Sequence, residues 1–130
     1  MKKLLACCVL CSVYLQALPL SVPVDVLYSP NYTQCLQHAL NEYDAVACTE
    51  QERKQQDKKL SNTYKKVMNS LTSSRQKDLQ RVQRLWIQYT DAKCSFFYHK
   101  QSGSAGLGAA AQCKLNETIR RTLELKEIQQ

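Results

Sequence analysis

The seven cysteines of this 130-residue chain constrain its fold more than any other feature, because they divide into two groups. Three lie close to the N-terminus: Cys7, Cys8 and Cys11. They belong to an apolar stretch, residues 4–15, that follows a basic start and is too short to span a bilayer. We therefore predict a cleavable signal peptide over residues 1–21, cut near residues 17–21, and a single exported domain over residues 22–130.

A lipid-anchored form is a competing interpretation, because Leu4-Leu5-Ala6-Cys7 looks like a lipobox. Almost no hydrophobic region would precede that cut, so we favour a cleaved, unanchored protein in the periplasm. On this interpretation no transmembrane segment remains in the mature chain.

Four cysteines follow the predicted signal: Cys35, Cys48, Cys94 and Cys113. An even number of cysteines in a short exported chain indicates disulfides. A domain of this size has a modest core, which disulfides help to stabilise. Four cysteines allow three pairings, and the sequence alone leaves the choice open. We favour the two local pairs, Cys35–Cys48 and Cys94–Cys113.

The net charge is positive, with 18 Lys and Arg against 11 Asp and Glu, and loss of Lys2 and Lys3 would leave it near +5. Such a charge favours anionic partners, namely lipid, cell-wall polymer or nucleic acid. The charges are interspersed, however, as on an ordinary soluble helical surface. We therefore keep anionic cell-wall polymer or lipid as an alternative partner and predict no binding to nucleic acid.

Helical periodicity dominates the rest of the chain, so we predict an all-α fold, a small antiparallel bundle of three to four helices. The expected helices cover residues 33–43, 49–71, 74–98 and 110–128, after an extended lead-in over residues 18–31. Residues 51–59 are nearly all polar, so we expect that half of the second helix to face solvent. Ser73 and Gln76 are expected to form a capping box for the third helix.

Apolar side chains recur at helical spacing in each of the last three helices. The second helix carries Leu60, Tyr64, Val67, Met68 and Leu71, the third carries Leu79, Val82, Trp86, Tyr89 and Phe97, and the last carries Leu115, Ile119 and Leu123. We expect these stripes to form the core, with Trp86 anchoring the second helix against the third.

Residues 99–109 are rich in Gly, Ser and Ala and are expected to form a loop between the third and fourth helices. A Cys94–Cys113 disulfide would tie this loop at its base and reduce the entropy lost on binding. Loops on a rigid scaffold often carry recognition, which makes four polar residues candidate contacts: His99, Lys100, Ser102 and Ser104.

Catalytic and metal-binding constellations are missing from the sequence. Only His38 and His99 supply imidazole groups, and paired cysteines would supply no thiolate nucleophile. None of the four cysteines after the predicted signal lies at the spacing of a zinc site. We therefore predict a protein that is not an enzyme and that needs neither metal nor cofactor.

A family resemblance covers most of the predicted domain. Its strongest part runs from Leu79 through Gln83, Trp86 and Asp91 to Cys94, preceded by Asp57, Leu60 and Tyr64 and followed by Cys113 and Arg121. This pattern resembles the LprI-like lysozyme-inhibitor family of exported bacterial proteins. The chain departs from the usual family pattern at Thr90, where an Arg is common, and at Ser61, where an Asn is common.

The resemblance implies an exported helical domain that inhibits lysozyme, or a related cell-wall hydrolase, through protein–protein contact. On this hypothesis the 99–108 segment enters the enzyme's cleft and meets its two catalytic carboxylates. Animal-type lysozymes are basic like this chain, so a local acidic patch is needed, for which Glu42, Asp44, Glu50 and Glu52 are candidates. The alternative is a non-catalytic envelope module that binds anionic polymer or lipid.

Overall fold

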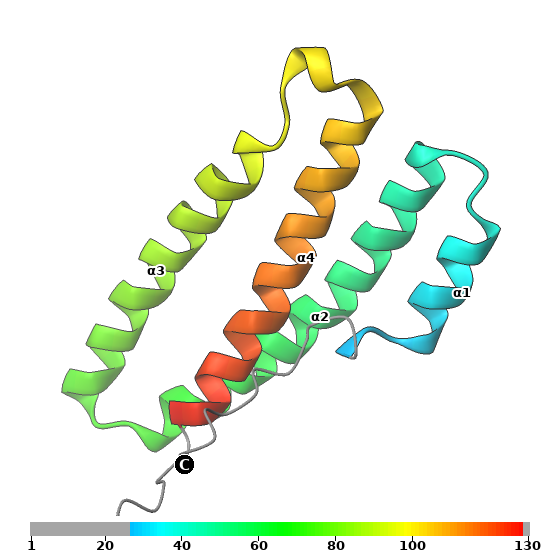
Figure 1. Cartoon of the computed structure of the whole chain (residues 1–130). Coiled ribbons are helices and arrows are strands. Elements are labelled where there is room, and N and C mark those ends of the chain that lie inside the picture. The colour runs from blue at the N-terminus through cyan, green and yellow to red at the C-terminus, as the bar shows by residue number, and fades with distance from the viewer. Residues whose placement is uncertain (1–26, 129–130) are drawn as a thin grey trace, which may run out of the picture.

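Four α-helices form the protein in the computed structural model, which describes residues 27–128 (Figure 1). The helices are α1 (Pro30–His38), α2 (Glu42–Ser70), α3 (Ser73–Phe96) and α4 (Gly103–Ile128), with a 3₁₀ turn, η2 (Lys100–Ser102), before α4. This confirms the predicted all-α fold. The predicted signal peptide and its cleavage site lie outside the described residues. Within the described part, no helix has the combination of length and apolar character that a membrane span requires.

The break between α1 and α2 lies earlier in the chain than predicted, because capping residues define it. Ser29 caps α1, its hydroxyl accepting a hydrogen bond from Tyr32 N at 3.2 Å, and Pro30 occupies the first helical position. Asn41 caps α2 by accepting from Asp44 N at 3.1 Å, and the Asp44 carboxylate accepts from Leu40 N in return. As a result α2 begins at Glu42 and includes residues 42–43, which the sequence predicts in the first helix.

The junction between α2 and α3 differs from the predicted capping box. Thr72 is the N-cap of α3, and its side chain makes no capping hydrogen bond. Gln76 instead donates its side-chain amide to the carbonyl groups of Met68 and Leu71, at 2.9 and 3.2 Å. Gln76 therefore satisfies the C-terminal carbonyls of α2, which have no partner within that helix.

The helices pack around α4, which lies between α2 and α3 (Figure 1). The main packing is between α2 and α4, while α3 packs on α4 over a smaller surface and α1 covers the first half of α2. In Figure 1, α3 runs antiparallel to both α2 and α4. Trp86 packs against a core cluster that has members on α2, α3 and α4. It is only partly buried, and its ring lies 6.0 Å from the guanidinium of Arg121 on α4.

Two clusters of buried side chains form the core. One contains Tyr32, Cys48, Leu115 and Ile119, and the other contains Leu60, Val67, Leu79 and Leu125 with Trp86 packed against it. The predicted stripe on the third helix is only partly correct, since Val82, Tyr89 and Phe97 are exposed. α3 packs mainly on α4, so the buried face of α3 is narrow and runs through Leu79, Thr90 and Cys94.

The polar half of α2 is buried in part, which contradicts the prediction that it faces solvent. Glu52 and Gln56 are 1% and 3% exposed. Glu52 accepts hydrogen bonds from Ser29 N at 3.0 Å, Ser29 Oγ at 2.6 Å and Gln56 Nε2 at 2.7 Å. Gln56 also donates to the carbonyl of Leu27 at 3.1 Å. These side chains are buried because they bind the segment that leads into α1, whose polar groups need partners.

The two local disulfides predicted from the sequence are confirmed. Cys35–Cys48 joins α1 to α2 and Cys94–Cys113 joins α3 to α4, with Cα atoms 5.8 and 5.4 Å apart. Each disulfide therefore fastens a more peripheral helix to the α2–α4 pair.

Candidate protein-binding site

The connection between α3 and α4 is shorter than the predicted loop, because α4 begins at Gly103 instead of near residue 110. Gly103 has a φ of 57°, which glycine adopts without strain, and the chain turns there into α4. Gly106 lies inside α4, where an added Cβ would be 2.7 Å from Ser102 Cβ. At Gly108 an added Cβ would overlap the Glu42 carboxylate. The glycine-rich stretch therefore reflects close packing of α4 more than a flexible connector.

The four predicted contact residues do not all lie on an exposed loop. His99 is exposed and caps η2, since its Nδ1 accepts a hydrogen bond from Gln101 N at 3.3 Å. Ser102 is exposed at the end of η2, whereas Ser104 is half-buried in the first turn of α4. Lys100 is the first residue of η2. His99 and Ser102 are thus exposed side chains next to the α3–α4 turn.

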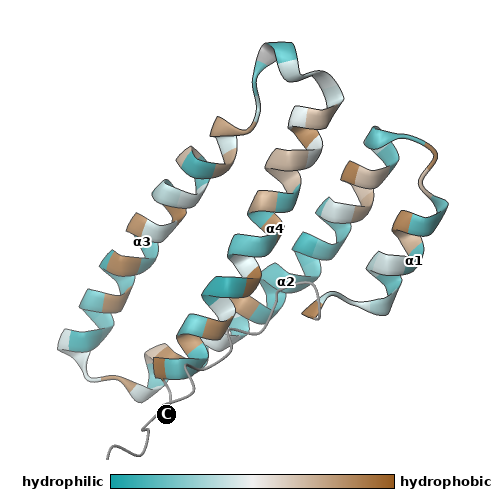
Figure 2. Ribbon diagram, viewed as in Figure 1, coloured by the Kyte–Doolittle hydropathy of each residue, from teal (hydrophilic) through white to brown (hydrophobic). Residues whose placement is uncertain are grey.

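Three consecutive aromatic residues at the end of α3 form the most exposed apolar feature at this turn. We call Phe96, Phe97 and Tyr98, which are 86%, 47% and 50% exposed, the aromatic tip. The rings of Phe96 and Phe97 pack edge to face with centroids 6.3 Å apart. Figure 2 shows the last turn of α3 as hydrophobic. The disulfide at Cys94, two residues before Phe96, holds the tip against α4.

Helical periodicity predicts Phe97 in the core and does not single out its neighbours. The missed signal is that successive side chains on a helix point about 100° apart, so three consecutive aromatic residues cannot share one buried face. At least one of them must face solvent or a partner.

The predicted acidic patch is smaller than expected. Glu42 and Asp44, in the first turn of α2, are exposed. Glu50 accepts hydrogen bonds from Arg53 at 2.8 and 2.9 Å, which raises the pKa of Arg53, and Glu52 is buried. Glu42 approaches Gly108 of α4, so the remaining acidic groups lie at the same end of the molecule as the aromatic tip.

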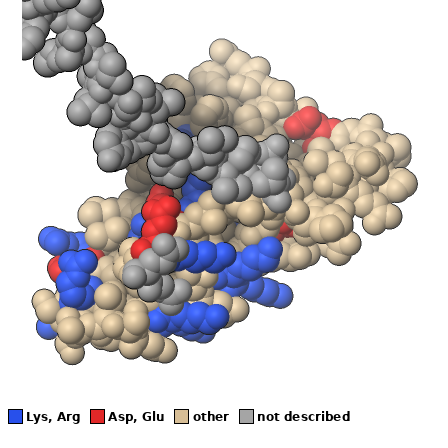
Figure 3. Space-filling model, turned by 60° about the horizontal axis from the view of Figure 1, so that its bottom comes forward, with Lys and Arg blue, Asp and Glu red and all other residues tan. Residues whose placement is uncertain are grey.

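Basic side chains gather at the opposite end of the molecule. Figure 3 brings that end forward and shows Lys and Arg spread over it. The exposed members are Lys58, Lys65 and Lys66 of α2, Arg75, Lys77, Arg81 and Arg84 of α3, and Lys126 of α4. We call this set the basic end. The positive charge is therefore separated from the aromatic tip along the length of the helices.

The residues that carry the family resemblance form contacts within the helices and between them. Arg121 donates its Nε to Gln83 at 2.9 Å, and Lys114 lies 3.6 Å from Asp91, so both pairs join α4 to α3. Asp57 pairs with Arg53 at 2.6 Å within α2, Leu60 is buried, and Tyr64 packs against the second core cluster. These contacts indicate a structural role for the motif.

One polar contact in the α3–α4 interface is incomplete. Arg121 is 6% exposed, and its Nη2 has no hydrogen-bond partner within the described part of the chain. The hydroxyl of Thr90, at the position where the resembled family commonly has Arg, is also buried without a partner there. Two polar groups in the α3–α4 interface, Arg121 Nη2 and the Thr90 hydroxyl, therefore make no hydrogen bond within the described residues.

Comparison with known proteins agrees with the resemblance seen in the sequence. The family described as "Lysozyme inhibitor LprI" matches residues 32–125. An uncharacterized protein of Rhizobium meliloti (strain 1021) is 26% identical over an alignment of 104 residues. The match covers 69% of this chain and 75% of that protein. No solved structure matches the chain.

Proposed function

The chain belongs to the lysozyme inhibitor LprI family, and on that basis we propose that it inhibits a lysozyme by protein–protein contact through the aromatic tip. The two disulfides support export to an oxidising compartment, for which we propose the bacterial periplasm. In this proposal the protein blocks its target by binding and carries out no chemistry of its own.

The exposure of the aromatic tip is the observation that carries the proposal. Phe96 is 86% exposed, although removing a phenyl ring from water lowers the free energy of the system. Protein interfaces concentrate their binding energy in a few residues, with aromatic side chains prominent among them. The Cys94–Cys113 disulfide holds the tip in place before binding, which reduces the entropy lost on association.

The distribution of charge favours this end of the molecule for a basic partner. Glu42 and Asp44 are exposed at the tip end, whereas the basic end lies at the far side of the helices. A basic lysozyme that approached the basic end would be repelled, and one that approached the tip would not. His99 and Ser102, exposed beside the tip, supply polar groups for the two catalytic carboxylates of the enzyme.

The test is inhibition of a panel of purified lysozymes by the wild-type chain and by a Phe96→Ala, Tyr98→Ala double variant. We expect the double variant to lose about 2 kcal/mol of binding free energy or more, which is roughly 30-fold in Kd. Leu85→Ala is the matched control, because Leu85 is 58% exposed on the same helix but lies away from the tip. Equal inhibition by wild type and a folded double variant would refute the proposed surface.

A second function is favoured by the basic end, namely binding of an anionic envelope polymer or lipid surface. Binding of this kind depends on charge and weakens steeply as salt is added. A tip-mediated complex with lysozyme should respond less to salt. Substitution of Arg75, Arg81 and Arg84 by Gln should weaken binding to an anionic polymer and leave lysozyme inhibition unchanged.

A further inference from the structure

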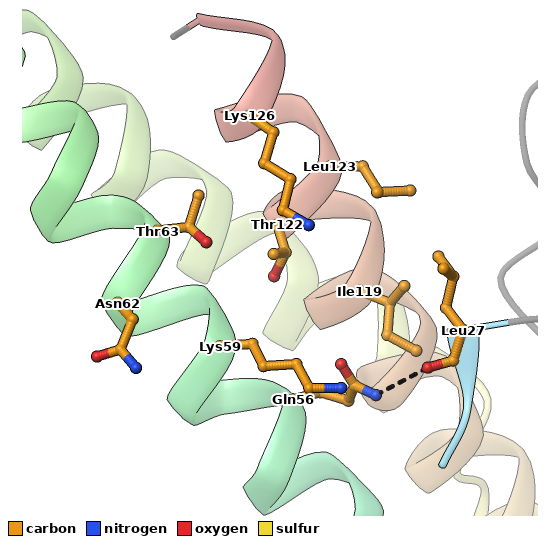
Figure 4. Close-up of a pocket in the computed structure, with 9 residues that line it drawn as sticks. All are labelled: Leu27, Gln56, Lys59, Asn62, Thr63, Ile119, Thr122, Leu123 and Lys126. Atoms are coloured by element: carbon orange, nitrogen blue, oxygen red, sulfur yellow. Dashed lines mark hydrogen bonds between the residues drawn. The ribbon is translucent and has the colours of Figure 1, made fainter. Parts of the chain in front are cut away.

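A pocket of about 310 Å³ lies between α2 and α4, on a different part of the molecule from the aromatic tip. Figure 4 shows side chains from both helices pointing into it, with Leu27 closing one end. This volume is at the lower limit of the range for pockets that bind small molecules. The pocket therefore has room for part of a small ligand.

One side of the pocket is apolar. Leu27, Ile119 and Leu123 line it, and Ile119 also belongs to the first core cluster. Gln56 lines the pocket as well, but its side-chain amide already donates to Leu27 O and to Glu52. These hydrogen bonds hold Leu27 against α2, so the apolar side is fixed by the fold and does not have to form when a ligand binds.

Two ammonium groups enter the pocket from opposite walls, Lys59 from α2 and Lys126 from α4 (Figure 4). Neither forms an ion pair with any residue in the described 27–128 region, whereas Lys93 and Lys114 do so with Glu117 and Asp91. The charge of Lys59 contributes to lowering the pKa of Glu52. The Glu52 carboxylate itself accepts its hydrogen bonds from Ser29 and Gln56.

Two positive charges that line one partly enclosed space, neither of them in an ion pair, create a positive potential there, which the nearby charge of Glu52 reduces on the Lys59 side. Asn62 and Thr63 add an amide and a hydroxyl group to the same pocket. A negatively charged group placed between the lysines would gain charge-assisted hydrogen bonds. An alkyl chain attached to that group would be removed from water against Leu27, Ile119 and Leu123.

We propose that this pocket binds an anionic amphiphile, with its carboxylate or phosphate group between Lys59 and Lys126 and its alkyl chain against the apolar side. The site does not depend on lysozyme inhibition, because it shares no residue with the aromatic tip. Carboxylate and phosphate head groups have the same recognition chemistry here, so the experiment includes both.

The experiment is isothermal titration of the disulfide-intact chain, at low ionic strength and below micelle-forming concentrations. The probes are decanoate, decyl phosphate, inorganic phosphate and the uncharged decyl maltoside. We expect saturable 1:1 binding of decanoate, decyl phosphate or both, and at least tenfold weaker binding of the other two probes. Which of the two decyl anions binds more tightly identifies the preferred head group.

The test variant is Lys59→Gln with Lys126→Gln, and the matched control is Lys65→Gln with Lys66→Gln. All four lysines are exposed at least in part, but Lys65 and Lys66 do not line the pocket. We expect the test variant to bind the decyl anions at least tenfold more weakly and the control to bind like wild type. Equal loss in both variants would show nonspecific charge attraction, and tight binding of inorganic phosphate would exclude a role for the apolar side. Either result, or the absence of saturable binding, would overturn the proposal.

Discussion

Glu52 offers the sharpest test of how α1 and its lead-in are attached to the rest of the protein. Its carboxylate is 1% exposed and accepts three hydrogen bonds, two from Ser29 and one from Gln56. Replacement by Ala removes the acceptor, so Ser29 N and one N–H of the Gln56 amide lose their partner, while the Gln56 amide keeps its hydrogen bond to Leu27 O. We therefore expect Glu52→Ala to destabilise the protein far more than a surface substitution would.

The magnitude follows from the two orphaned donors. A buried donor that loses its acceptor costs about 1–3 kcal/mol, so two of them cost about 2–6 kcal/mol, and we expect about 4 kcal/mol. Glu52→Gln keeps the size and one acceptor oxygen, so we expect about half that loss. Glu50→Ala is the control, because Glu50 is half-exposed and its ion pair with Arg53 contributes less than about 1 kcal/mol.

The assay is urea unfolding under non-reducing conditions, followed by circular dichroism, with the free energy of unfolding taken by linear extrapolation. The reasoning is refuted if Glu52→Ala and Glu50→Ala lose the same stability within about 1 kcal/mol, with unchanged dependence on urea. Such a result would mean that solvent or neighbouring groups replace the carboxylate at no cost.

The same carboxylate makes stability depend on pH. Burial acts to raise the pKa of Glu52, but hydrogen bonds from Ser29 and Gln56 outweigh it, and the pKa lies below its ordinary value of 4.5. A lowered pKa in the folded state stabilises the protein above the pKa of the unfolded state, and this contribution is lost as pH falls through the folded value. The stability difference between wild type and Glu52→Gln should therefore be constant at neutral pH and shrink below about pH 4.5. A difference that is the same at pH 7 and at pH 3 would contradict this assignment.

Two further predictions concern packing and are checked by the same urea assay. Leu115 is fully buried between the helices, so Leu115→Ala should cost about 2–5 kcal/mol, while Leu85→Ala on the exposed side of α3 should cost less than about 0.5 kcal/mol. Gly106→Ala should destabilise the protein by about 1 kcal/mol or more, because its Cβ would press on fixed groups of the preceding turn. Gly108→Ala meets only a flexible exposed carboxylate and should instead stabilise α4 by about 0.5–1 kcal/mol. The opposite order for the two glycines would show that the close approach at Gly106 is relieved easily.

The predictable parts of the fold are those that local chemistry determines. The end of α2 at Ser70 lies within a residue of the sequence prediction, because the apolar periodicity ends there. The disulfide pairing was also predicted correctly, since both pairs join residues close in the chain. The start of α2 was missed, although Asn41 and Asp44 are a recognisable capping pair.

Interactions between distant segments were not predictable from periodicity. The burial of Glu52 and Gln56 depends on Ser29 and Leu27, more than 20 residues earlier, and a polar helical face carries no sign of such partners. The position of α4 between α2 and α3 was missed for a related reason. A short link requires neighbouring helices to run in opposite directions but does not require them to pack on each other.

The proposed binding surface lies at the turn that the sequence also singles out, but it involves different residues. The two cysteines Cys94 and Cys113 correctly marked the α3–α4 turn as a tied segment. The polar residues of that turn attracted attention, whereas the more prominent exposed groups are Phe96 and its aromatic neighbours. Hydropathy assigns phenylalanine to the core by default, and although three consecutive aromatic residues imply that one is exposed, which rings are exposed can be recognised only once the packing is known.

The separation of charge along the helices gives the molecule an electric dipole. Along α3, a 24-residue helix and hence about 36 Å long, the basic end occupies the first half and the aromatic tip lies at the C-terminal end. Near a negatively charged surface, the field exerts a torque that turns the basic end inward, within a Debye length of about 8 Å at physiological salt. The protein would thus be oriented before any contact forms, with Phe96 and its neighbours directed away from that surface and toward whatever approaches it.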